Sequence, residues 1–180
     1  ILAHLHSINS RSLPKGKYQF EQYIDEGKNY IKRINRYNSS LKDELRKLNQ
    51  KIKSNLPRSE EHRFSMIHGD VCPQNIVETK HGLKLIDWES MQYSDPAKDI
   101  ANILIDVGLK DSHLDLFIQE YEKIRKDPTI LPRARIYALL LRYEYTLWEI
   151  TRSFEIINKE LPQEYLSKTS AQRHINEAKT

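Results

Sequence analysis

The side chains best suited to chemistry are concentrated in one short stretch of the sequence. His68, Asp70 and Asn75 occur in the order H-x-D-x-x-x-x-N, and Asp87 follows within the segment I-D-W-E at 86–89. A loop carboxylate can accept the proton of an attacking hydroxyl group, whereas an amide oxygen and a second carboxylate can together bind a hard cation such as Mg²⁺. These groups are the minimum equipment for phosphoryl transfer, which depends mainly on positioning and charge neutralisation.

This spacing is more specific than chance would give. Three fixed positions of the pattern would arise in a chain of this length at roughly 2%. A chance match is made less expected still by three further features: Gly69, Pro73, and the Asp-Trp pair at the end of a later Leu-rich segment.

The block resembles the catalytic core of the aminoglycoside phosphotransferase and choline kinase family, whose members are related to the protein kinases. In that family H-G-D-x-x-x-x-N is the catalytic loop, and I-D-W-E replaces the D-F-G motif of protein kinases. The segment D-P-A-K-D-I-A at 95–101 is similar to the family's G-D-P-x-x-D-L-A, with Ser94 where glycine is usual. The resemblance covers nearly the whole chain but is specific only over 68–101.

The resemblance implies a role for each matched residue. Asp70 would be the catalytic carboxylate that orients and deprotonates the substrate hydroxyl, and Asn75 and Asp87 would hold Mg²⁺ on the nucleotide phosphates. We count His68 with Asp70 among the catalytic-loop residues. We expect His68 and Asp99 to brace the loop by hydrogen bonds rather than to take part in the chemistry.

Hydrophobic periodicity predicts the elements that position these residues. Short apolar runs at 64–68, 75–78 and 83–87 indicate strands, and they form the only convincing β region. Helical spacing predicts helices over 20–37 and 41–52, either separate or as one helix broken near 38–40, and over 96–107, 114–124 and 132–159. The chain is therefore predicted to be α+β and mostly helical. The resemblance implies the carboxy-terminal lobe of a protein-kinase-like fold, with a small β-hairpin carrying the catalytic loop.

The nucleotide-gripping parts of such a kinase are not found in the sequence. The five glycines are too scattered for a glycine-rich phosphate loop, and no upstream strand offers a paired lysine. Residues 1–7 resemble the L-A-x-L-H-x helix that opens the helical lobe of the family. We therefore expect residues 1–180 to be one kinase-like lobe, a fragment that lacks the amino-terminal nucleotide-binding lobe and is nearly inactive alone.

Composition excludes several other classes of protein. The chain is 30% charged, and no apolar run approaches the ~20 residues that span a bilayer, so a membrane-embedded protein is excluded. Cys72 is the single cysteine and no signal peptide opens the chain, which indicates a cytoplasmic location. The net charge of +4 is a small excess spread along the chain. It favours a solvated surface over nucleic-acid binding.

The long helix offers two candidate substrate-binding residues. Glu144 and Trp148 are four residues apart and share a helix face. A carboxylate beside an aromatic ring suits a cationic substrate through charge and cation–π attraction. Ordinary packing of the helix explains the same pattern. The segment 143–148 is faintly similar to the aromatic helix of choline-kinase-type members, which points to an amino alcohol or aminosugar.

Three hypotheses about function follow. The first is a transferase that uses ATP, or GTP, and Mg²⁺ to phosphorylate a hydroxyl of a small, amine-bearing molecule such as an aminoglycoside or choline. The second is a non-catalytic kinase-like lobe, and the third is a RIO-like kinase that acts on a macromolecule. Trp88 and Glu89 in place of Phe-Gly, followed by Asp95 and Pro96, favour the small-molecule branch over the third hypothesis.

Overall fold

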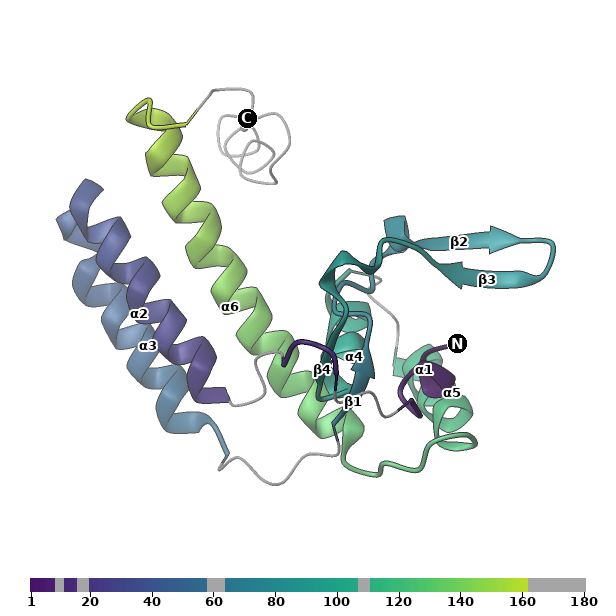
Figure 1. Ribbon diagram of the computed structural model, residues 1–180. Helices are drawn as coiled ribbons and strands as arrows, with labels where there is room; N and C mark the ends of the chain where they lie inside the picture. The colour runs from purple at the N-terminus through teal and green to yellow at the C-terminus, as the bar shows by residue number, and fades with distance from the viewer. Residues whose placement is uncertain (9–11, 16–19, 58–63, 107–110, 162–180) are drawn as a thin grey trace. The chain divides into compact units, whose positions relative to one another are not determined.

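The computed structural model describes residues 1–8, 12–15, 20–57, 64–106 and 111–161 (Figure 1). The chain forms two compact units, and each is described by itself. The first unit comprises residues 1–20 and 58–140, and the second comprises residues 21–57 and 141–180. No helix in the described part of the chain is long and apolar enough to cross a membrane.

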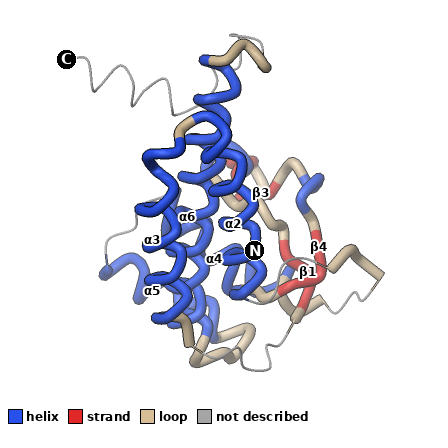
Figure 2. The backbone as a smooth tube through the Cα atoms, turned by 90° about the vertical axis from the view of Figure 1, so that its left-hand side faces the viewer, coloured by secondary structure: helices blue, strands red, loops and turns tan. Residues whose placement is uncertain are grey.

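Two antiparallel strand pairs lie in the first unit. β1 (Ser65–Ile67) pairs with β4 (Gln92–Ser94), and β2 (Ile76–Thr79) pairs with β3 (Gly82–Leu85). The predicted strands are confirmed to within a few residues, and β2 and β3 form the predicted hairpin. The sequence does not predict β4, whose partner β1 lies far along the chain. Figure 2 shows that strands occupy only a small part of a mostly helical chain.

The first unit contains several helices, and one of them is largely buried. They are α1 (Leu2–Leu5), α4 (Ala97–Asp106), α5 (Asp111–Glu122) and the beginning of α6 (Ile130–Ile157). Residues 97–101 of α4 are all buried, including the carboxylate-bearing Asp99. The predicted end of this helix at 107 lies outside the described residues. α4 therefore carries a charged side chain into the interior, where it needs hydrogen-bonding partners.

The core of the first unit is formed by apolar side chains from every one of these helices and from β1. Each fully buried Ile or Leu contributes about 1.5–3 kcal/mol relative to an exposed one. The buried positions include Leu2, Leu5, Ile67, Val71, Ile100, Leu114, Tyr121, Ile130, Tyr137 and Leu140.

The second unit is built from α2 (Phe20–Tyr37), α3 (Lys42–Asn55) and the later part of α6. Ile24, Ile31 and Ile34 are buried, as the spacing in α2 predicts. The predicted break near 38–40 is present. Asn38 is extended and its side chain accepts a hydrogen bond from the Ser40 amide at 3.0 Å, which begins the short 3₁₀ turn Ser39–Leu41.

The predicted apolar face of α3 is only partly correct. Ile52 is buried, but Leu48 is 44% exposed, and the neighbouring Asn49 is buried instead. Asn49 Oδ1 accepts a hydrogen bond from the Tyr143 hydroxyl of α6 at 2.9 Å. This side-chain bond turns a polar residue inward, and apolar periodicity alone does not reveal it.

Candidate active site

The H-G-D sequence contains a glycine that no other residue can replace without backbone movement. Gly69 has a φ of +88°, and a Cβ on it would lie 2.3 Å from the carbonyl oxygen of Ser90. The positive φ disfavours other residues, and the close approach excludes a side chain. Gly69 therefore lets the loop that follows β1 contact the backbone of the turn Trp88–Ser90.

Asp99 holds this loop from the interior. Its Oδ2 accepts a hydrogen bond from the His68 amide and its Oδ1 accepts one from the Gly69 amide, both at 2.8 Å. His6 of the N-terminal segment donates from Nε2 to the same Oδ2 at 3.0 Å. Burial raises the pKa of Tyr121, so its hydroxyl stays protonated and donates to His6 Nδ1 at 2.8 Å. The carboxylate is fully buried but has three donors, as a buried charge requires.

The His68 ring connects the loop to the segment that carries Asp87. Its Nε2 lies 2.9 Å from the carbonyl oxygen of Ile86, and its Nδ1 accepts from the Asp70 amide at 3.3 Å. A carbonyl oxygen can only accept, so Nε2 is the donor in this hydrogen bond. The Trp88 ring packs against His68 with a centroid separation of 4.8 Å. His68 thus braces the loop by hydrogen bonds and packing.

Asn75 fixes the orientation of Asp70. Its Nδ2 donates to Asp70 Oδ2 at 2.9 Å and to the Asp70 carbonyl oxygen at 3.0 Å. Asn75 is buried, whereas Asp70 is exposed. One carboxylate oxygen of Asp70 is therefore held, and the other has no hydrogen-bond donor within the described part of the chain.

Asp87 has a strained backbone. Its φ and ψ are 62° and 71°, in the left-handed region that residues with a Cβ rarely adopt. Such a residue costs on the order of 1–3 kcal/mol and persists only where the surroundings fix it. The preceding Ile86 is held at both backbone groups, because its amide donates to the Asn75 carbonyl at 3.0 Å and its carbonyl accepts from His68. The loop that contains Asp70 and Asn75 therefore holds the backbone immediately before Asp87.

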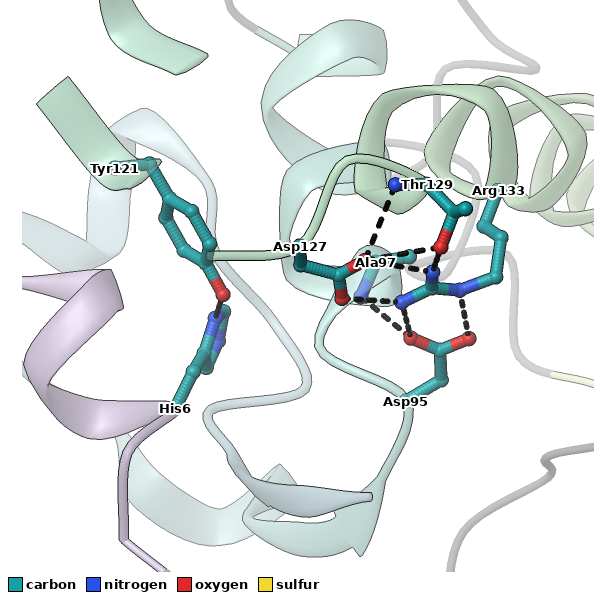
Figure 3. A network of polar contacts seen from close by, with 7 residues as sticks. All are labelled: His6, Asp95, Ala97, Tyr121, Asp127, Thr129 and Arg133. Atoms are coloured by element: carbon teal, nitrogen blue, oxygen red, sulfur yellow. Dashed lines mark hydrogen bonds and ion pairs between the residues drawn. The ribbon is translucent and has the colours of Figure 1, made fainter. Parts of the chain in front are cut away.

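A buried ion cluster secures the N-terminus of α4 (Figure 3). Asp95 Oδ1 accepts a hydrogen bond from the Ala97 amide at 2.9 Å, as an N-terminal cap of a helix does. Arg133 of α6 binds both oxygens of Asp95, at 2.9 and 3.0 Å, and also contacts Asp127 at 2.8 Å. Burial opposes the charge on Arg133, but the two carboxylates outweigh this effect and raise its pKa. The cluster fixes α4 and with it Asp99.

A model of the phosphotransferase enzyme family matches residues 1–137. The chain belongs to this family. No curated protein matches the sequence.

Solved structures of phosphotransferases have the same fold. A choline/ethanolamine kinase family protein from Mesorhizobium loti has a TM-score of 0.65 at 18% identity, with 90% of this chain and 53% of that chain covered. The choline kinase LicA from Streptococcus pneumoniae has a TM-score of 0.57 at 22% identity, covering 97% and 59%. A spectinomycin phosphotransferase in complex with ADP and spectinomycin has a TM-score of 0.55 at 17% identity, covering 91% and 54%. The chain thus spans about half the length of these proteins, and the predicted fold class is confirmed.

The site of this phosphotransferase-family chain offers oxygen ligands rather than a complete metal cage. The described residues contain no group of three or more His, Cys, Asp or Glu arranged to hold a metal ion. The Asn75 amide nitrogen is engaged by Asp70, and the exposed Asp87 carboxylate follows a fixed residue. Mg²⁺ commonly takes only one or two protein ligands and completes its shell with water and phosphate oxygens. Asn75 Oδ1 and Asp87 fit that chemistry.

The predicted substrate-binding pair lies in the second unit, on α6. Glu144 is half-buried, and its charge adds to burial in raising the pKa of Tyr30. The Trp148 ring stacks on Tyr145 at 5.4 Å, and the Arg152 guanidinium lies 5.6 Å from its centroid. A cation of the protein itself therefore already contacts the Trp148 ring.

Three supporting residues of the first unit have no signal in the catalytic motifs. The sequence pattern indicates His6 only as part of the opening helix, yet it contacts Asp99. Arg133 and Asp127 lie far along the chain from Asp95, and Arg133 forms ion pairs with both carboxylates. An arginine inside an otherwise apolar helix face was the one available sign of the cluster.

Proposed function

We propose that this chain is the helical lobe of a phosphotransferase that moves the γ-phosphoryl group of ATP, or GTP, to a hydroxyl group of a small molecule. The observation that carries the proposal is the exposed Asp70 carboxylate, held on one oxygen by Asn75 in a loop that buried Asp99 braces. The family membership and the fold of the kinases support it. This activity also requires a nucleotide-binding lobe. The existence of that lobe is part of the proposal, because the chain spans only about half the length of the structurally similar kinases.

Asp70 acts on the acceptor hydroxyl. Its free oxygen accepts the hydroxyl proton, while the hydrogen bond from Asn75 keeps the carboxylate in one rotamer. Positioning of this kind supplies a large part of the rate enhancement, because the transition state is loose and needs little covalent assistance. His68 and Asp99 keep the loop in place and do not touch the reacting atoms.

Asn75 and Asp87 would hold Mg²⁺ with the nucleotide. When bound, the cation would neutralise the phosphate charge that develops during transfer. The Asn75 side chain has two tasks in this arrangement, because its nitrogen donates to Asp70 while its oxygen is left for the cation.

The substrate is proposed to carry an amine. Choline, ethanolamine and spectinomycin, after which the structurally similar kinases are named, each combine a hydroxyl with an amine or a quaternary ammonium group. Glu144 is the better of the two predicted contacts, since a carboxylate attracts a cationic group, whereas the Trp148 ring already contacts Arg152. The non-catalytic alternative is less favoured, because a strained Asp87 and an exposed, oriented Asp70 serve no purpose in packing.

The test is phosphoryl transfer by the longest natural polypeptide that contains this chain. ADP release would be measured with choline, ethanolamine, spectinomycin and, as an amine-free control, glycerol. We expect turnover with at least one amine-bearing acceptor, little with glycerol, and loss of turnover in Asp70→Asn. Full activity of Asp70→Asn, or no transfer to any acceptor, would contradict the proposal. A RIO-like kinase would instead phosphorylate added protein.

A further inference from the structure

The second unit contains a cavity that the proposed reaction does not use. It has a volume of about 610 Å³ and lies between α2 and α3. This volume is within the ~300–1,000 Å³ range of small-molecule sites. Both of its walls are helices of the same unit, so its shape does not depend on the first unit.

The cavity is lined by positive charge. Lys32 of α2 and Lys42 and Arg46 of α3 line it, and none of the three has an ion pair with a described residue. Lys28 also lines it but is paired with Asp25 at 2.7 Å. Residues 28–53 contain nine Lys or Arg and two Asp or Glu, whereas the whole chain has a net charge of only +4. The excess of basic residues is thus concentrated in this segment. The expectation that it is spread along the whole chain is wrong.

Two asparagine side chains also line the cavity. Asn35 Oδ1 is buried and has no hydrogen-bond partner among the described residues. Asn49 is buried beside it in the lining, and its Oδ1 is engaged by Tyr143. An unpartnered buried acceptor is costly, about 1–3 kcal/mol, and a hydroxyl donor would satisfy it. A solvated basic face would not need buried amide groups beside its cations.

We propose that this cavity binds a small polyanion that carries two or more phosphate or carboxylate groups and at least one hydroxyl. The cations at the rim attract the anionic groups, and a ligand hydroxyl donates to Asn35. Such a ligand differs from the amine-bearing acceptor, so this is a second site. A cavity bounded by two helices favours a small molecule over a nucleic-acid strand, which needs an extended groove.

The probes are fructose 1,6-bisphosphate, citrate and tripolyphosphate, titrated calorimetrically into the chain at 150 mM NaCl. The first two separate phosphate from carboxylate ligands, and tripolyphosphate lacks an alcohol hydroxyl. The cavity variant is Lys32→Gln/Lys42→Gln/Arg46→Gln. The matched control, Lys47→Gln/Lys51→Gln/Lys53→Gln, removes the same charge from exposed positions of α3 that do not line the cavity.

We expect at least one hydroxyl-bearing probe to bind, and its Kd to rise 10-fold or more in the cavity variant but less than 3-fold in the control. Asn35→Leu should weaken that probe and leave tripolyphosphate unchanged. An equal rise in Kd in both triple variants would mean that the probe binds to the general positive charge of the helices, and it would overturn the proposed site. Binding of none of the probes would overturn it also, as would binding of single-stranded RNA alone. Circular dichroism and thermal melting would confirm that each variant is folded, and the readout is independent of phosphotransferase activity.

Discussion

Asn75 donates a hydrogen bond from its side-chain nitrogen to Oδ2 of Asp70 over 2.9 Å. A second bond from the same nitrogen reaches the Asp70 carbonyl oxygen, so the amide spans side chain and backbone. The proposed base is thereby oriented by a residue that is itself proposed to bind the metal ion. Asp70 is proposed to act on the acceptor hydroxyl and Asp87 on the metal ion, so substitutions at these two residues should have different kinetic effects.

Asp70→Asn should lower kcat by about 10²–10⁴ in the polypeptide that includes the nucleotide-binding lobe. The Asn oxygen can still accept from Asn75, so the loop keeps its shape while the proton acceptor is lost. Affinity for Mg²⁺-ATP should stay within a few-fold, as calorimetric titration would measure. A large loss of nucleotide affinity in this variant would mean that Asp70 is a metal ligand.

Asp87→Asn should weaken nucleotide binding as well as turnover. The substitution removes a negative ligand from a hard cation. The same titration, repeated with and without Mg²⁺, should show that the loss of ATP affinity requires the metal. Nucleotide affinity equal to that of the wild type would remove Asp87 from the metal site.

Gly69→Ala should destabilise the protein more than Gly82→Ala. Both glycines have positive φ, at +88° and +98°, so both substitutions carry similar backbone strain of about 1 kcal/mol. Only the Cβ at 69 would meet a backbone oxygen, at 2.3 Å, whereas nothing lies within 4 Å of the Cβ at 82. Denaturant unfolding of the two variants would measure the difference, and equal destabilisation would contradict the close packing of the loop.

Asp99→Asn should cost about 1–3 kcal/mol of stability or more. An amide has one acceptor oxygen, so either the His68 or the Gly69 amide would lose its partner inside the core. We also expect kcat to fall while the KM for ATP changes little, since the loop loses its brace. Unfolding midpoints measured by chemical denaturation would check the stability. A change below 0.5 kcal/mol would show that the loop does not depend on Asp99.

Asp127 should make stability fall in acid. Burial raises the pKa of this carboxyl, but the hydrogen bonds and charge of Arg133 outweigh burial, and its pKa lies below the ordinary value of 3.8. A lowered folded-state pKa contributes stability above about pH 4, which is lost as the pH falls through the folded-state value. Asp127→Asn should therefore melt below the wild type at pH 7, and the gap should narrow at pH 3. Asp115→Asn, at an exposed position of α5, is the control and should show no such convergence.

The parts of the fold that the sequence predicts are those encoded locally. The loop, the β2–β3 hairpin and the long helices depend on neighbouring residues and on periodicity, and these predictions are confirmed. β4 is missed because its partner β1 lies far along the chain, with Ser65 opposite Ser94. Arg133 and His6 are missed for the same reason, since their hydrogen bonds join distant segments. The roles proposed for Asp70, Asn75 and Asp87 rest on the motif, on the hydrogen bond from Asn75 to Asp70, and on the backbone bond from Ile86 to Asn75.

The three donors on Asp99 also determine when the loop can take its shape. The His6 bond closes a span of 93 residues and the Gly69 bond closes one of 30. The residues of the loop precede Asp99 in the chain, so they leave the ribosome before the carboxylate that holds them. Closure of long spans is slow because its entropy is lost before the contacts form. We therefore expect the H-G-D loop to form late, after α4 has been synthesised and has packed. An emerging chain would then carry the proposed catalytic residues before they have their final arrangement.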